Sequence, residues 1–173
     1  MLDPSLQIEL KKANRTVTII HLALLTEPFI YIIIALALKQ MGGFEGIQGF
    51  SESLPIVRLA CGLISVVMIA NAIFVRRSLL SPEKIVPAGA EPKMVGTLYS
   101  RAHITIGAIA TAPAVVGLVW FVISGNTDLL IVLSGASIAL QILAFPRYEA
   151  LEKVVPARVM QGETLQRAHT EFH

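Results

Sequence analysis

The sequence predicts an all-α integral membrane protein in which four helices form an antiparallel bundle. Hydrophobic residues make up 54% of the 173 residues and charged residues 15%, whereas globular domains carry about a quarter charged residues. Four apolar stretches approach or exceed the roughly 20 residues that a helix needs to cross the hydrocarbon core. Because backbone polar groups find no water in lipid, these stretches are expected to be helices. We expect residues 1–173 to form a single membrane domain.

The four predicted spans are residues 16–38, 54–75, 102–124 and 129–145, of which the last is the shortest. Ahead of the first span, Asp3 followed by Pro4 is typical of a helix N-terminus. The short connection Gly125–Asp128 predicts a tight turn, so the last two spans are expected to form a hairpin.

The longer connections differ in character. Residues 40–53 repeat glycine with apolar residues between, which is typical of a flexible turn on the membrane interface or of a small ligand-contacting loop. Residues 76–101 contain three prolines and predict an irregular linker. In the C-terminal tail, residues 147–173, the last helix is expected to continue over about 148–155.

The distribution of basic residues predicts the orientation. Twelve of the fourteen lie before the first span, between the second and third spans, or after the fourth span. They are Lys11, Lys12, Arg15, Arg76, Arg77, Lys84, Lys93, Arg101, Arg147, Lys153, Arg158 and Arg167. The positive-inside rule then places both termini, the 76–101 linker and the tail in the cytoplasm. We expect a multi-pass protein of the cell membrane, of the bacterial or archaeal inner-membrane type.

A weak internal repeat links the first and third spans. TEPFIYIIIALAL, from Thr26, aligns with TAPAVVGLVWFVI, from Thr111, and the alignment pairs Pro28 with Pro113. The repeat predicts two helical hairpins of the same orientation, although apolar helices also resemble one another by chance.

Glu27 is the strongest candidate functional residue, since a carboxyl group within a membrane span is costly and rare. Counting at 1.5 Å per residue places it roughly 14 Å from the cytoplasmic ends of the spans. The polar residues at that depth, one from each span, are Glu27, Ser65, Thr111 and Ser137. We expect Glu27 to face the bundle interior in a neutral form, or to exchange a proton with the cytoplasm. Arg58 is the only opposite charge within reach, but snorkelling to the headgroups is easier for its side chain.

The two prolines of the repeat add a second candidate feature. Each removes a backbone donor, and so frees the carbonyl four residues earlier, at Leu24 before Pro28 and at Ile109 before Pro113. Freed carbonyls beside a carboxyl group suit a proton or a small cation. The alternative is that these prolines only bend the helices for packing.

A shallower polar layer also takes one residue from each span: His21, Asn71, His103 and Gln141. Two histidines that face each other across a bundle suit a haem b cofactor. The alternative is that both are hydrogen-bonded or snorkel to the interface.

The run AVVGLVWFVISG, Ala114–Gly125, resembles the ion-carrying helix of the proteolipid (c-type) ring subunits of rotary ATPases. In that family a buried carboxylate carries the proton or sodium ion. The matching position here is Thr111, and the carboxylate appears in the repeated segment, at Glu27. Otherwise the pattern is that of an unassigned four-helix bacterial membrane protein.

Several functions are disfavoured. A net charge of +2 is too small for nucleic-acid binding, and the lone Cys61 precludes a disulfide framework or a thiolate metal site. No phosphate loop, HExxH or nucleophile elbow is present, so we expect neither an enzyme nor a metal site. The leading hypothesis is a small subunit of a membrane complex, or a self-associating protein, with a buried contact at Glu27. The alternatives are ion transport (a proton or cation) through Glu27, and a haem-binding electron-transfer anchor.

Overall fold

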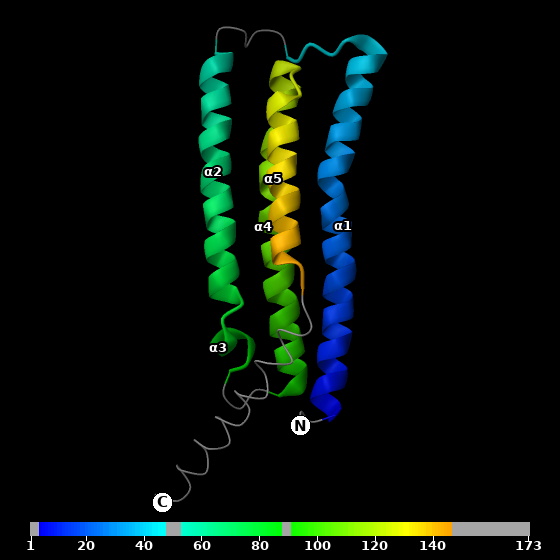
Figure 1. Cartoon of the computed structure of the whole chain (residues 1–173), viewed down its shortest axis with the longest axis vertical. Coiled ribbons are helices and arrows are strands. Elements are labelled where there is room, and N and C mark those ends of the chain that lie inside the picture. Colours follow the sequence, from blue (N-terminus) through cyan, green and yellow to red (C-terminus); the bar gives the residue numbers. More distant parts are fainter. Residues whose placement is uncertain (1–3, 48–52, 88–90, 147–173) are drawn as a thin grey trace, which may run out of the picture.

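The computed structural model describes residues 4–47, 53–87 and 91–146, and these ranges are predominantly helical (Figure 1). The helices are α1 (Pro4–Gly42), α2 (Leu54–Leu79), α3 (Pro82–Ile85), α4 (Pro92–Ser124) and α5 (Asp128–Ala144). The all-α class is therefore confirmed. Three of the helices, α1, α2 and α4, are long and apolar enough to cross a membrane, whereas α5 has 17 residues. Helix α1 begins at Pro4, as its sequence predicts.

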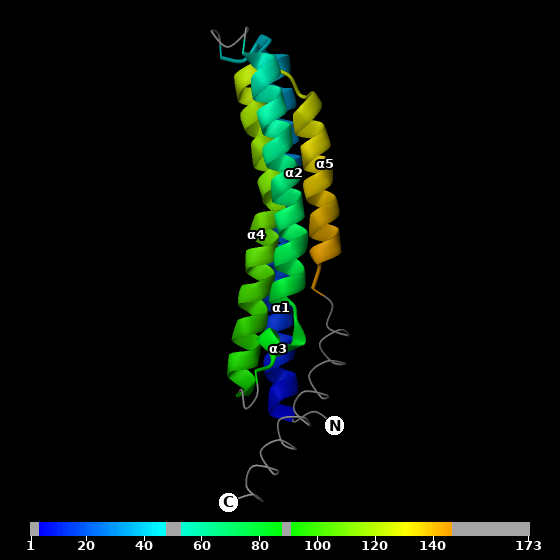
Figure 2. The ribbon, with the colours of Figure 1, turned by 90° about the vertical axis from the view of Figure 1, so that its left-hand side faces the viewer.

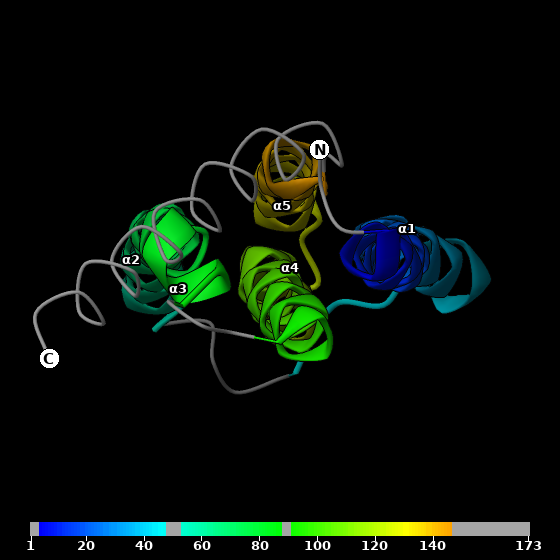
Figure 3. The ribbon, with the colours of Figure 1, turned by 90° about the horizontal axis from the view of Figure 1, so that it is seen from below.

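Helix α4 is the central element of the molecule. It packs against every other helix, while α1 and α2 lie on its opposite sides and make no extensive contact with each other (Figure 3). Helices α1 and α4 run in the same direction, and α2 and α5 run the opposite way (Figure 1). The prediction of two similar hairpins is thus correct for α4–α5 and wrong for α1–α2.

The first connection explains this separation of α1 from α2. After α1 the chain passes over the end of α4, where the Ile47 backbone N–H donates to the Ile123 carbonyl at 3.1 Å. Gly46 and Gly125 meet there with φ of 86° and 67°, and a side chain at Gly46 would lie 2.5 Å from the Ile123 carbonyl oxygen. Phe44 also packs on Phe121, with 5.3 Å between ring centroids. Residues 43–47 are therefore packed against protein rather than resting only on the interface, and residues 48–52 lie outside the described ranges.

Helix α1 contacts its neighbours through one narrow stripe. Its most buried residues recur at spacings of four and seven, which keeps them on one face of a helix. They are Leu10, Val17, His21, Pro28 and Ala35. Large apolar side chains on the other faces are exposed, as a lipid-facing helix requires.

The segment 76–101 is not the irregular linker that its prolines predict. Helix α2 continues to Leu79, and Pro82 and Pro92 are the first residues of α3 and α4. Proline is well tolerated there because the first residues of a helix have no internal partner for their N–H groups. At the end of α3, Ile85 and the following Val86 pack in one cluster with residues of α1 and α4: Leu10, Val17, Val95 and Tyr99.

Helix α5 covers only part of α4. In the side view it accompanies the later part of α4, and the early turns of α4 and α1 extend well beyond its end (Figure 2). Within the described ranges, the first turns of α1 and α4 are therefore not covered by α5. The tail expected to extend the last helix, residues 147–173, lies outside the described ranges.

Candidate functional site

A buried polar layer forms where α1, α4 and α5 meet. His21, His103 and Gln141 come from these three helices, and each is less than 5% exposed. The two imidazole rings lie edge to face with centroids 5.8 Å apart. The structure thus brings together three of the four residues predicted for this layer. The fourth, Asn71, is exposed on α2, which packs on the far side of α4 from α1.

Several polar atoms of this layer have no hydrogen-bond partner among the described residues. They are both ring nitrogens of His21, Nδ1 of His103 and Oε1 of Gln141. The backbone carbonyl of Ala144, at the end of α5, also lies near His103. Unpartnered buried polar groups are rare and commonly mark a bound water, an ion or a functional role.

Aromatic rings enclose the histidine pair. Tyr99 packs on His103 with 4.5 Å between ring centroids, and Phe145 packs on His21 with 6.1 Å between ring centroids. The Tyr99 hydroxyl donates to the Asn14 side-chain oxygen at 2.9 Å, which ties α4 to α1 beside the layer. These rings occupy the flanks of the histidine pair, so a porphyrin between the imidazoles would have to displace them. The arrangement does not fit haem as it stands.

Gly107 lets α1 approach α4 closely at the layer. A methyl group at this position would lie 2.8 Å from Leu24 Cδ1 and 3.2 Å from His21 Cε1. The Gly107 carbonyl accepts a hydrogen bond of 2.9 Å from the Gln141 side-chain nitrogen. The absence of a side chain on α4 therefore makes room for the His21 ring.

The hydroxyls of the deeper layer do not surround Glu27 as expected. Ser65 and Thr111 each donate to a carbonyl of their own helix, at 2.7 and 2.8 Å. Ser137 donates across to the Ala110 carbonyl of α4 at 2.5 Å. A hydroxyl within a membrane helix finds its nearest acceptor in the backbone three or four residues earlier, which is a strong competitor for a distant carboxyl.

Glu27 itself is half-buried on α1. Its hydrogen-bond partner is Tyr31, one turn later on the same helix, while the adjacent Pro28 faces the core. Glu27 therefore lies at the edge of the packed stripe rather than inside it.

The two repeat prolines occupy equivalent, buried positions in α1 and α4. Two residues before each, a threonine donates to the carbonyl three residues earlier: Thr26 at 2.7 Å and Thr111 at 2.8 Å. Around Pro113, the side chains of Ser137 and Gln141 occupy carbonyls on α4. These two bonds use the Ala110 and Gly107 carbonyls, which neighbour the freed carbonyl of Ile109, and they join α5 to α4.

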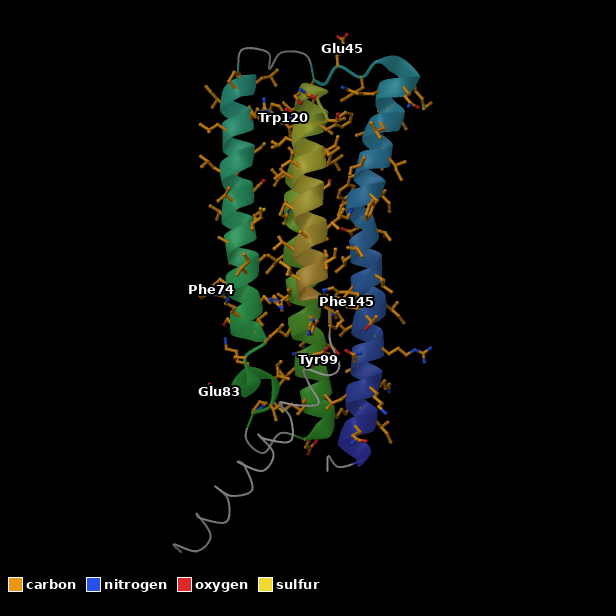
Figure 4. All side chains as sticks on the ribbon, viewed as in Figure 1. Glu45, Phe74, Glu83, Tyr99, Trp120 and Phe145 are labelled. Atoms are coloured by element: carbon orange, nitrogen blue, oxygen red, sulfur yellow. The ribbon has the colours of Figure 1, made fainter. Side chains whose placement is uncertain are left out.

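Arg58 has a different partner from the one considered in the sequence. It forms an ion pair of 2.8 Å with Asp128, whose carboxylate also accepts a 2.9 Å hydrogen bond from the Trp120 indole. Burial alone would raise the pKa of Asp128, but the Trp120 and backbone hydrogen bonds and the Arg58 charge together lower it. The three side chains join α2, α4 and α5 at the end where Trp120 lies (Figure 4).

Two further residues of the site escape sequence reasoning. Tyr99 precedes the third predicted span and falls in the expected linker, although its separation from Asn14 equals the offset of the internal repeat. Ser134 is fully buried on α5, and its hydroxyl has no hydrogen-bond partner among the described residues.

The described ranges contain no cluster of three or more His, Cys, Asp or Glu side chains that would suit a metal ion. Comparisons of the chain with protein-family models, with curated proteins and with solved structures find no match.

Proposed function

We propose that this protein is a multi-pass membrane protein that binds a proton at the layer of His21, His103 and Gln141 and carries it across the membrane. The observation that carries the proposal is the set of buried imidazole nitrogens without partners. An ionisable group inside a membrane bundle is by default a functional one, and imidazole is the side chain that exchanges protons near neutral pH.

The pair is suited to hold one proton at a time. His21 and His103 are in ring contact, so two positive charges would repel each other strongly in this interior. In its neutral form each imidazole offers one nitrogen lone pair to an incoming proton, and three of the four ring nitrogens have no partner among the described residues. The two histidines therefore act as one coupled acceptor.

A small cavity supports access to this acceptor. It has a volume of about 30 Å³, enough for one water molecule, and is lined by Arg76, Ile106 and Ala144, among others. The Ala144 backbone carbonyl lies beside His103, and Ala144 is what links this cavity to the layer. In the orientation favoured by the basic residues, this cavity lies on the cytoplasmic side, so the proton exchanges with the cytoplasm.

The test is proton flux into reconstituted vesicles that hold a pH-sensitive dye. His21→Gln and His103→Gln should each reduce the protein-dependent flux about tenfold or more, the loss typical of removing a proton-transfer group. Asn71→Ala is the matched control, since Asn71 is exposed on α2, and it should leave the flux unchanged. Flux equal to that of empty vesicles, or histidine variants as active as the original chain, would overturn the proposal.

A second candidate function, a subunit of a membrane complex or a self-associating protein, is favoured by Glu27. This carboxyl is only half-buried by its own chain, with Tyr31 as its partner, in the middle of a long apolar helix. Covering it with another membrane protein, or with a second copy, would remove the cost of facing lipid. Under this function a stoichiometric partner or a dimer is recovered in mild detergent. The variant Glu27→Leu, which removes the carboxyl, should weaken this association. A monomer that stays monomeric at high concentration would reject it.

A further inference from the structure

A groove lined by basic side chains lies between the N-terminal halves of α1 and α4. It has a volume of about 300 Å³. The side chains that matter here are Lys12 and Thr16 on α1, and Lys93, Thr97 and Arg101 on α4. Three of them are cationic and exposed, and Glu9 is the single carboxylate in the lining.

The groove adjoins the apolar part of both helices. Thr16 and Ala102 begin the predicted spans, so the cationic groups stand at the level of lipid headgroups. On the same face of α4 as Thr97 and Arg101, the helix continues with Ile104 and Val115, which are 39% and 42% exposed. Helix α5 ends before the first turns of α4 and does not reach the groove, and at the level of α5 this face of α4 stays partly exposed (Figure 2).

We infer that this groove binds the headgroup of an anionic phospholipid, whose acyl chains lie along the exposed apolar face of α4. The excess of positive charge selects an anionic headgroup over a zwitterionic one. The hydroxyls of Thr16 and Thr97 already donate to carbonyls of their own helices, at 3.2 and 2.9 Å, so the cationic side chains supply the recognition. The apolar face above the groove is what a lipid needs and a free phosphate does not. The inference is independent of proton binding at the histidine layer.

The experiment is native mass spectrometry of the full chain in detergent, with phosphatidylglycerol or phosphatidylcholine added at matched concentration. We expect retained phosphatidylglycerol on the original chain and about tenfold less on Lys93→Gln/Arg101→Gln. The matched control is Arg77→Gln/Lys84→Gln, which removes two exposed cations from α2 and α3, outside the groove. This variant should bind the lipid like the original chain. Lys12→Gln alone should give a smaller loss.

Three results would overturn the inference. Equal retention of the two lipids would mean that the protein does not select the lipid by the charge of its headgroup. Equal loss in both double variants would mean that net charge, rather than the groove, attracts the lipid. Undiminished binding in the groove variants would place the lipid elsewhere.

Discussion

Asn14 and Tyr99 are 85 residues apart in the chain, and the Tyr99 hydroxyl donates a 2.9 Å hydrogen bond to the Asn14 side chain. The same separation relates Thr26 to Thr111 and Pro28 to Pro113 in the internal repeat. The similar segments of α1 and α4 therefore run in parallel and lie at matching levels.

The likeness of the two segments extends to their local bonding. In each, a buried proline follows a threonine whose hydroxyl donates to the carbonyl three residues earlier. The likeness does not include the helix that follows each segment, because α5 packs on α4 whereas α2 does not pack on α1. Among the residues that the structure describes, this difference leaves one side of α1 without a neighbouring helix and Glu27 only partly covered.

The first prediction concerns the bond that joins α1 to α4. Tyr99→Phe should lower the stability by about 0.5–1.5 kcal/mol, because it removes one hydrogen bond without emptying the core. Thermal unfolding in detergent measures the effect. In an Asn14→Ala background the same substitution should cost clearly less, and full additivity of the two changes would show that the bond contributes nothing.

The sequence was sufficient for the helical class and for most helix positions. Length and apolarity predicted each long helix, and Asp3–Pro4 and Gly125–Asp128 predicted the start of α1 and the last turn. The side-by-side order of the helices could not be predicted, because a lipid-exposed helix is apolar on every face and its pattern does not identify its neighbours. The path of residues 43–47 over α4 depends on a backbone contact between two glycines, which no periodicity reveals.

The candidate site could be predicted in part. Counting depth brought His21, His103 and Gln141 to one level, and they do meet. Depth along a helix does not tell which side of the helix a residue is on, however. The count therefore also included Asn71, which is exposed on α2. It likewise suggested hydroxyl donors for Glu27, whereas these hydroxyls bond to backbone carbonyls at shorter range.

The second prediction ranks three glycine-to-alanine substitutions. A methyl group at Gly117 would lie 2.8 Å from the Leu130 Cα, so Gly117→Ala must move backbone and should cost about 1–3 kcal/mol. Gly107→Ala meets the end of the flexible Leu24 side chain and should cost less. Gly135→Ala is the control, because nothing lies within 4 Å of its added methyl, and it should be neutral or stabilising. A different order in thermal unfolding would contradict the packing of α1, α4 and α5.

The third prediction is a pH dependence at Asp128. Its pKa is lowered below the ordinary 3.8, so the carboxylate contributes stability above pH 3.8 that is lost as the pH falls through the folded-state pKa. The melting temperature of the original chain should exceed that of Asp128→Asn at pH 7, and the difference should shrink below pH 3.8. Arg58→Gln should show a similar but smaller pattern, because the Trp120 hydrogen bond is kept. A difference that does not change with pH would mean that charge is not involved.

The fourth prediction concerns haem. Because Tyr99 and Phe145 pack against the histidine pair, purified protein should show no Soret absorbance after expression with added haem precursor. Tyr99→Ala, which opens one flank, tests whether the ring is what excludes the porphyrin. A Soret band in the original chain that disappears in His21→Ala and His103→Ala would establish haem ligation and reject the proton-binding role.

The fifth prediction concerns orientation, which follows from the basic residues alone. In a Cys61→Ala background, Glu45→Cys should react with a membrane-impermeant maleimide on intact cells, because Glu45 is exposed on the connection that follows α1. Lys84→Cys, exposed in α3 at the other end of the molecule, should react only after the membrane is opened (Figure 1). The Cys61→Ala parent without a new thiol gives the background of the assay. The reverse labelling pattern would invert the chain in the membrane, and the cavity beside Arg76 would then open to the outside, so the histidine layer would exchange its proton with the external medium.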